Sequence, residues 1–350
     1  MIKKLIFPVA LLTLTVAPLT PRLAYSQTQS PSASFTSQVV PAGSDPPCQY
    51  GPNYAGSIPG PAQKAGYTTC YANYDFSTSY MDTLSNWLDC AGASPALWYN
   101  TGYLSNKSPC GRYTIVSDVV NGVTQNVLDM AYTNTDASNG ATGTWMNTVC
   151  GQSAPCNTGA GSGIWPVFGY YEITLEVLPA NTNVFAAWQG ANPSVYVEDM
   201  DYFGVVANNS KFIEYDTIEV TANNGSPYSG TANVGYGPNN GPGNFSGVPT
   251  FTYHNYANLV TSNGSATYDC AYLNGGSPNG CNSIGQPDAG SLYTQWGVGP
   301  SSGNSPCAGG GHGACPSLSQ DLHVRISSIR VFTCATWATA PCHETPITSP

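Results

Sequence analysis

The sequence predicts an all-β fold, a sandwich or barrel of antiparallel strands. Three observations predict it: short stretches in which apolar and polar residues alternate, turn residues between them, and no alternation of strand and helix patterns that would indicate a parallel sheet. Turn-forming residues are abundant, with 38 glycines and 28 prolines in 350 residues. A chain of this length can form one large all-β domain or two domains of ordinary size.

The clearest strand candidate is residues 169–177, with the sequence GYYEITLEV. Its Tyr, Ile, Leu and Val residues at odd positions fall on one face, and its Glu and Thr residues fall on the other. Residues 79–88 suggest a helix, with apolar residues at Tyr80, Leu84, Trp87 and Leu88. Further strands are expected at 183–188, 212–220, 250–256, 266–273 and 323–332.

Residues 1–26 have the pattern of a secretory signal peptide. Lys3 and Lys4 precede an apolar stretch at 5–19, and small residues frame a cleavage site near Ser26. A membrane anchor is the alternative, but the apolar stretch is short and interrupted by prolines. We therefore expect a polar leader at 27–46, one folded domain at 47–342 and a tail at 343–350. The protein is expected to be secreted, to the periplasm or the extracellular space, with no membrane attachment after cleavage.

Twelve cysteines fit an oxidising compartment. Zinc is the alternative to disulfides, but no C-x2-C motif occurs and the four histidines are scattered. Neither a metal nor another cofactor is expected, although a structural calcium ion stays open. Cys48, Cys70, Cys90 and Cys110 are expected to pair among themselves, in an order that the sequence leaves open. The other pairs expected, each close in sequence, are Cys150 with Cys156, Cys270 with Cys281, Cys307 with Cys315, and Cys334 with Cys342.

Composition excludes one class of partner and leaves another open. The net charge is −10 and the chain has nine Lys and Arg residues, whereas nucleic acid binding needs clustered basic residues. The 23 tyrosines and seven tryptophans offer apolar faces with polar edges, which suit sugar rings. Secreted β-rich proteins are often rich in Tyr for other reasons, so composition alone does not decide for carbohydrate.

The most informative segment is residues 213–220, with the sequence IEYDTIEV. On a regular strand Glu214 and Asp216 share one face, and a β-bulge before Glu219 would return that residue to the same face. Cleavage of a glycosidic bond needs an ionised carboxylate and a protonated carboxyl, and crowding of carboxyls raises the pKa of at least one of them. A solvated acidic face and a calcium site are the alternatives. For the second acidic group, at 198–201, a turn or a calcium site is the preferred interpretation.

The motif Glu214-x-Asp216-x-x-Glu219 resembles the E-x-D-x-x-E signature of glycoside hydrolase family 16, the laminarinase-like enzymes. Segments on both sides of this motif resemble further motifs of the family, and they occur in the same order along the chain. Before the motif, residues 169–172 match the family's G-x-x-E strand and residues 185–188 its W-P-A-F-W strand. After the motif, residues 253–256 match the H-x-Y strand, residues 272–275 the Y-x-D-G turn and residues 323–332 the closing strand. Ile213 and Tyr215 depart from the family pattern, and residues 185–188 lack its proline.

The resemblance implies a concanavalin A-like jelly-roll β-sandwich of two curved antiparallel sheets with a concave substrate cleft. It also implies a retaining endo-acting hydrolase of a β-linked polysaccharide, with β-1,3-glucan as the default substrate and a monomer as the expected state. A non-catalytic carbohydrate-binding or cell-envelope protein on the same fold is the alternative.

The resemblance also implies roles for single residues. Glu214 is expected to be the nucleophile, Asp216 its assistant and Glu219 the general acid/base. Trp188 is expected to stack on a sugar and His254 to hydrogen-bond to the carboxyls, although a core role for Trp188 and a structural role for His254 stay open. The substrate-binding residues expected are Trp188, His254, Tyr256 and Trp296.

Overall fold

The structure is a computed structural model in which contacts divide the chain into two units, Met1–Ser32 and Ala33–Pro350. All described residues lie in the second unit. The predicted signal peptide, leader and tail lie outside them and stay predictions. The described residues are 48–93, 96–100, 108–133, 135–136, 144–148, 165–166, 168–178, 192–199, 213–220, 227–233, 243–245, 248, 251–262, 267–283, 293–301 and 321–335.

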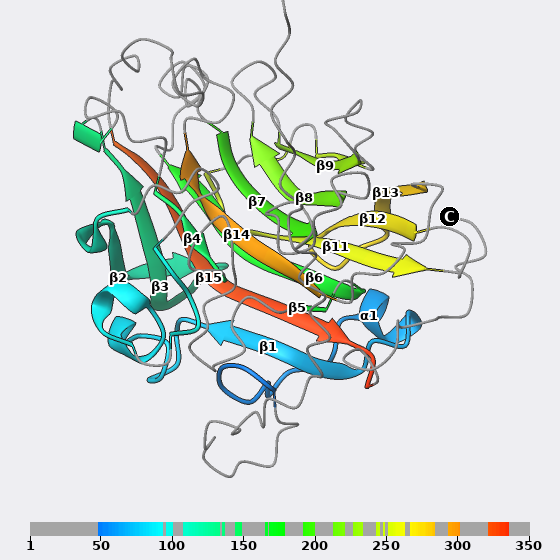
Figure 1. Ribbon diagram of the computed structural model, residues 1–350, viewed down its shortest axis with the longest axis horizontal. Helices are drawn as coiled ribbons and strands as arrows, with labels where there is room; N and C mark the ends of the chain where they lie inside the picture. The colour runs from blue at the N-terminus through cyan, green and yellow to red at the C-terminus, as the bar shows by residue number, and fades with distance from the viewer. Residues whose placement is uncertain are drawn as a thin grey trace, which may run out of the picture. The chain divides into compact units, whose positions relative to one another are not determined.

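Two antiparallel sheets make up most of this part of the chain, which confirms the predicted all-β sandwich (Figure 1). The eight-stranded sheet has the order β13-β12-β11-β6-β15-β3-β2, and β1 pairs with β15 beside this path. Its strands are β1 (Thr69–Asp75), β2 (Tyr113–Val120), β3 (Val123–Tyr132), β6 (Gly169–Leu178), β11 (His254–Ser262), β12 (Thr267–Leu273), β13 (Pro278–Ser283) and β15 (Leu322–Thr333).

The seven-stranded sheet has the order β10-β9-β8-β7-β14-β4, with β5 paired to β14. Figure 1 shows β7, β8 and β14 curving along their length. The cleft predicted across this sheet stays a prediction. Its strands are β4 (Met146–Asn147), β5 (Trp165–Pro166), β7 (Asn192–Asp199), β8 (Ile213–Val220), β9 (Pro227–Asn233), β10 (Gly243–Asn244) and β14 (Tyr293–Ser301).

Strand β15 organises the eight-stranded sheet because it is long enough to pair with three strands. One edge pairs with β6 along most of its length, with a bulge between Ile326 and Ser328. On the other edge its first part pairs with β3 and its second part with β1. In Figure 1, β15 and β1 run side by side.

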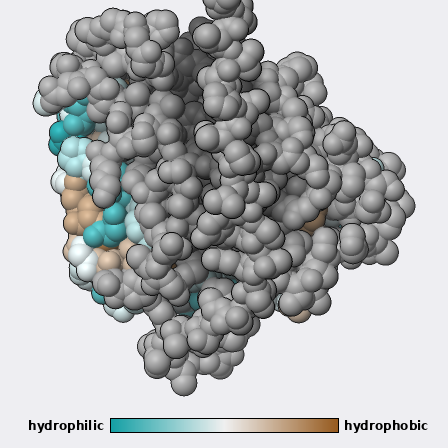
Figure 2. Space-filling model, in the orientation of Figure 1, coloured by the Kyte–Doolittle hydropathy of each residue, from teal (hydrophilic) through white to brown (hydrophobic). Residues whose placement is uncertain are grey.

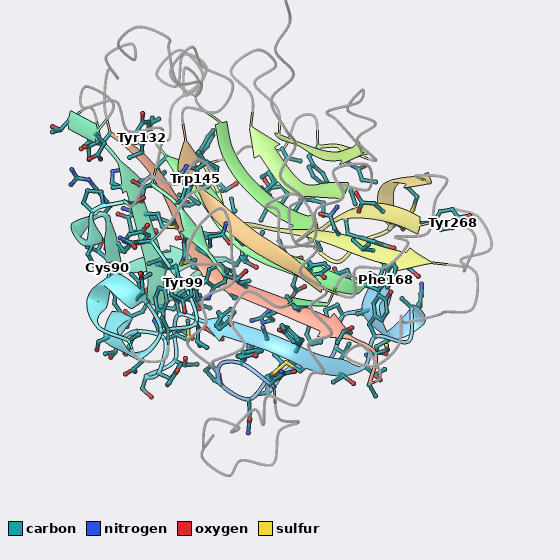
Figure 3. The ribbon with its side chains drawn as sticks, viewed as in Figure 1. Cys90, Tyr99, Tyr132, Trp145, Phe168 and Tyr268 are labelled. Atoms are coloured by element: carbon teal, nitrogen blue, oxygen red, sulfur yellow. A yellow bond between two sulfur atoms is a disulfide. The ribbon has the colours of Figure 1, made fainter. Side chains whose placement is uncertain are left out.

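The two sheets share one apolar core. On β6 the side chains of Ile173 and Leu175 are buried, as the predicted alternation requires. They belong to the same cluster as Met146 of β4 and Ile218 of β8, so the sheets pack face to face. Buried aromatic side chains extend the core: Figure 3 shows Tyr132 and Trp145 toward one end of the view, and Phe168 toward the other, near the short helix α1 (Gly60–Lys64).

The helix expected at 79–88 is wrong. The chain instead forms the 3-10 turns η1 (Leu84–Asn86) and η2 (Asp89–Ala91), and a third, η3 (Cys110–Arg112), follows later. The Asn86 amide donates to the Tyr80 carbonyl at 2.8 Å, and the Trp87 indole donates to the Met81 carbonyl at 2.9 Å. These side chains satisfy backbone groups that a helix would otherwise use. In the part of the chain that the structure describes, no helix is both long and apolar enough to cross a membrane.

Four of the predicted strands, at 169–177, 212–220, 266–273 and 323–332, are confirmed within one or two residues at their ends. The strand expected at 250–256 is misplaced, because β11 begins only at His254 and continues to Ser262. Its register explains the difference: β11 pairs along β6 from Leu175 to Gly169, whereas residues 251–252 form a turn before it. The strand expected at 183–188 lies outside the described residues.

Three disulfides are present in the described residues. Cys270 is bonded to Cys281, as predicted, and the order left open among the first four cysteines is Cys48 with Cys70 and Cys90 with Cys110. Cross-links that close loops of about 20 residues each stabilise the fold by roughly 3 kcal/mol. Cys334 is also disulfide-bonded. The remaining predicted partners, Cys150, Cys156, Cys307, Cys315 and Cys342, lie outside the described residues.

A tight hairpin joins β2 to β3 at an edge of the eight-stranded sheet. Asn121 and Gly122 both have positive φ, 50° and 85°, the conformation of a two-residue hairpin turn with the right-handed strand twist. The flanking side chains of Val119 and Val123 are exposed. Figure 2 shows hydrophilic and hydrophobic surface interspersed along the left margin of this face, where Figure 1 places β2 and β3.

The outer face of the eight-stranded sheet carries a network of paired charges. Arg325 of β15 lies 2.8 Å from an Asp118 oxygen, 3.4 Å from Asp129 and 3.7 Å from Glu176. His323 adds a 3.0 Å contact to Asp129. Burial, and then the nearby Asp118 carboxyl, raise the pKa of Glu176 to about 7, against which Arg325 acts only in part.

This network makes stability depend on pH. A carboxyl whose pKa is raised by folding binds its proton more tightly in the folded state, so its contribution is present below about pH 4.5 and is lost as the pH rises through 7. Replacing Glu176 by Gln removes that titration. We expect the Tm of the wild type to fall relative to the Tm of Glu176→Gln by about 2–4 °C between pH 5 and pH 8, measured by differential scanning calorimetry.

The comparison with Glu176→Gln separates Glu176 from two other groups whose pKa values also make stability depend on pH. Burial raises the pKa of Glu172, which acts in the same direction, and burial lowers the pKa of His254, which acts in the opposite direction. Both groups are present in both proteins, so the difference between the two Tm curves reports Glu176 alone. Parallel curves across this pH range would contradict the assignment.

Candidate functional site

The acidic strand β8 lies inside the seven-stranded sheet, paired with β7 on one side and β9 on the other. Asp216 pairs with Gly230 and Glu219 with Tyr228, so three steps along β8 match two steps along β9. The pairing with β7 shifts at the same place, between Val195 and Tyr196. The β-bulge predicted between Asp216 and Glu219 is therefore present.

Burial shows how the bulge is oriented. Thr217 is 0% exposed and Ile218 is 2% exposed, although neighbours on a regular strand point to opposite faces. The bulge places both positions on the core face, and Ile218 belongs to the core cluster. By register, positions 214, 216 and 219 then share the face that points away from the core. The side chains described on β8 are those of Thr217 and Ile218, so the spacing of the three carboxyls stays a prediction.

The rows across the sheet place small residues beside the acids. Asp216 lies between Gly230 of β9 and Tyr196 of β7, and Tyr196 pairs in turn with Gly297 of β14. Glu219 lies between Tyr228 and Ser194, and Ser194 pairs with Gly299. The direct neighbours of Asp216 and Glu219 across the sheet are therefore one glycine, one serine and two tyrosines.

The charge of the two sheets differs. No Lys, Arg or His occurs in the strands of the seven-stranded sheet as described, whereas β7 carries Glu198 and Asp199 and β8 carries its three acids. In the eight-stranded sheet several acids lie near cations, as with Glu172, which accepts a hydrogen bond from Arg330 at 3.2 Å. Acids without a nearby cation have a higher affinity for protons than paired acids.

For two predicted substrate-binding aromatics the structure gives the register of one and the surroundings of the other. Trp296 of β14 pairs with Val197, which pairs with Tyr215, so its position falls on the core face and not with Glu214 and Asp216. Tyr256 is 1% exposed, and its ring packs on Phe245 at 5.3 Å between centroids. Neither residue is part of the site proposed below. Trp188 lies outside the described residues.

His254 lies at the start of β11, in the eight-stranded sheet. Its Nε2 is 3.0 Å from the Thr252 hydroxyl, and its Nδ1 is 3.1 Å from the Asn274 amide nitrogen. Both ring nitrogens are therefore engaged by neutral side chains, and burial lowers the pKa of the imidazole. These contacts are compatible with the structural role left open by the sequence. The carboxyl side chains of β8 are outside those described, so the expected bond from His254 to them stays a prediction.

Glu198 is the residue near β8 whose place the sequence interpretation missed. It pairs directly with Glu214, and Glu198 and Asp199 lie in strand β7, so a turn at these two residues is wrong. The alternation Ser194-Val195-Tyr196-Val197 could have indicated a strand. Asp201 lies outside the described residues. Among the side chains described, no group of three or more His, Cys, Asp or Glu residues is arranged to hold a metal ion.

The bulge can be tested by a pair of core substitutions. Ile218→Ala should lower the free energy of unfolding by about 2–5 kcal/mol, because it leaves a cavity in the core. Thr217→Val keeps the size of a side chain whose hydroxyl has no hydrogen-bond partner among the described residues. We expect it to change the free energy of unfolding by less than about 0.5 kcal/mol or to raise it by up to about 1 kcal/mol. Urea unfolding measures both.

The pair is informative because the two residues are adjacent. A substitution on the surface would instead change the free energy of unfolding by about 0.5 kcal/mol or less. An effect of that size for Ile218→Ala, or a large loss for Thr217→Val, would contradict the burial of both positions.

Three solved structures illustrate what the chain is similar to. The catalytic domain of an endo-1,3-β-glucanase (laminarinase) from Thermotoga petrophila RKU-1 is 16% identical, with 64% of this chain and 75% of that chain covered and a TM-score of 0.37. A non-specific endo-β-1,3(4)-glucanase from family GH16 is 14% identical, with coverage of 62% and 77% and a TM-score of 0.40. An endo-β-1,4-glucuronan lyase from the fungus Trichoderma reesei is 12% identical, with coverage of 71% and 98% and a TM-score of 0.41.

The likeness includes the family that the acidic motif resembles, but its level is low. The TM-scores lie below 0.5, and the three proteins include both hydrolases and a lyase. The likeness therefore carries no argument about activity. No protein-family model and no curated protein matches the sequence.

Proposed function

We propose that this protein is a retaining, endo-acting glycoside hydrolase of a β-linked polysaccharide, with β-1,3-glucan as the first substrate to test. The observation that carries the proposal is the bulge in β8, because it gives Glu214, Asp216 and Glu219 one common face of the sheet. The sequence motif supplies the residue types, and the bulge supplies the register that the chemistry needs.

In the proposed reaction Glu214 attacks the anomeric carbon as a carboxylate. Glu219 gives its proton to the glycosidic oxygen, so the bond from the anomeric carbon to that oxygen breaks as the bond to Glu214 forms. The departing chain leaves as an alcohol. Glu219, now ionised, then takes a proton from water, and the resulting oxygen nucleophile displaces Glu214 with retention of the anomeric configuration.

The charge of the seven-stranded sheet supports these roles. A general acid must hold a proton near neutral pH, which requires a pKa above the usual range of a carboxyl. Strand β8 carries three acids, and the described strands of its sheet carry no Lys, Arg or His. Both features favour a raised carboxyl pKa. Asp216, between the two glutamates, is suited to share a proton with Glu214 while its charge changes.

Glycines in the rows that contain the acids are compatible with action within a polymer. Gly230 lies on one side of Asp216 and Gly297 two strands away on the other, so a chain of sugars could cross the sheet over the acids. Retention further requires the two glutamate carboxyls to lie about 5–5.5 Å apart. Position 219 must therefore approach position 214 over a concave surface.

We expect Glu214→Gln and Glu219→Gln each to lower kcat on laminarin by at least about 1,000-fold, because each removes a group that reacts in the transition state. Binding of laminarin should remain within roughly tenfold of the wild type. Release of reducing ends measures turnover, affinity electrophoresis measures binding, and NMR of the first product measures retention. The same assay over mixed-linkage glucan, agarose, carrageenan, xyloglucan and galactan selects the substrate.

Asp82→Asn is a matched control, since it removes a carboxylate from the segment before η1, away from β8 in the fold. It should leave turnover unchanged. Wild-type turnover in both glutamate variants would contradict the proposal. Retention of glucan on the gel by the wild-type protein, with no new reducing ends on any substrate, would instead indicate the non-catalytic carbohydrate-binding protein.

A further inference from the structure

A second glutamate lies directly opposite the proposed nucleophile. The register of β7 and β8 pairs Glu198 with Glu214. Directly opposed residues of an antiparallel pair share a face and have Cβ atoms about 4.5–5.5 Å apart, and like charges at such positions destabilise the sheet. Two glutamates in this arrangement need a reason, because a neutral residue at position 198 would avoid the repulsion.

Few other groups can act on this pair from the neighbouring strands. Glu214 pairs on its other side with Ala232 of β9, and Asp216 is the acid two residues along its own strand. Glu198 pairs on its far side with Gln295 of β14, a neutral residue that can donate or accept a hydrogen bond. The described strands of this sheet carry no basic residue, so repulsion between the two carboxylates can be relieved by sharing a proton.

We propose that Glu198 is a positioning residue for Glu214, holding the proton that the two carboxyls share. This inference rests on the proposed function. A protonated Glu198 donates a hydrogen bond to the Glu214 carboxylate, which stabilises the ionised form required for attack and fixes its orientation. The pair then works in its half-ionised form, and its two proton affinities belong to the pair and not to either residue.

The sign of the effect follows from the protonation state in acid. Below neutral pH Glu198 carries its proton and has no charge, so its main effect on Glu214 is the hydrogen bond and not repulsion. A hydrogen bond to the charged form lowers the pKa of a carboxyl. Removal of Glu198 therefore raises the pKa of Glu214, and activity is lost at a higher pH when the solution is acidified.

The test compares three variants by their pH profiles of kcat/KM. Glu198→Leu, which cannot donate, should lose about tenfold in kcat/KM and move the acid limb upward by about one pH unit. Glu198→Gln, which donates from an amide, should recover kcat/KM to within about threefold of the wild type. Asp199→Asn removes a carboxylate from the adjacent position of the same strand, on the other face by register, and should leave the acid limb in place.

Three outcomes would overturn the inference. Wild-type kcat/KM and a wild-type acid limb in Glu198→Leu would show that position 198 does not act on Glu214. Equal losses in the Leu and Gln variants would indicate packing in place of a donated hydrogen bond. Complete loss at every pH in Glu198→Gln would make Glu198 itself a reacting group. In each case an inactive Glu214→Gln keeps the proposed function, whereas an active Glu214→Gln removes it.

Discussion

The β-bulge at Thr217 and Ile218 links the core of the sandwich to the surface that carries the acids. The register shift places an extra residue of β8 between Asp216 and Glu219, and Thr217 and Ile218, which lie at that place, are both buried. The same extra residue decides on which face Glu219 falls. Packing of Ile218 against the facing sheet therefore maintains the register on which the proposed chemistry depends, and the two cannot be altered independently.

Basic residues are distributed unequally between the two sheets. Because the chain has few of them, their placement decides which acids have a cation nearby. The chain has nine Lys and Arg residues against 19 Asp and Glu residues, so not every acid can have a Lys or Arg of its own. Arg325 and Arg330, both on β15, form ion pairs with acids of the eight-stranded sheet. The described strands of the seven-stranded sheet carry no Lys, Arg or His, whereas β7 and β8 carry five acids. Pairing thus contributes to the stability of one sheet, and the proposed proton chemistry falls on the other.

Features of the fold that depend on neighbouring residues could be predicted from the sequence. Features that depend on contacts between distant segments could not. Alternation predicted β6, and the spacing of Glu214, Asp216 and Glu219 predicted the bulge, because both depend on neighbours along the chain. The Asn121-Gly122 hairpin carried an equally local signal that was overlooked. The partner of His254 could not be predicted in this way, since Asn274 reaches it from the following hairpin. Nor could the place of Glu198, which depends on the register between two strands that are separated by a long connection.

The division between the sheets is consistent with the competing demands of stability and catalysis. A site that must hold unpaired acids close together is unfavourable for folding, and the surrounding structure has to compensate. In this chain the compensation lies elsewhere: the Arg325 network and the Cys270–Cys281 disulfide belong to the eight-stranded sheet. A cation placed among the acids of β7 and β8 would relieve their repulsion, but it would also ionise the carboxyl that has to arrive protonated. The absence of basic residues from the described strands of that sheet is therefore what the proposed reaction would require, in addition to being a result of the low charge of the chain.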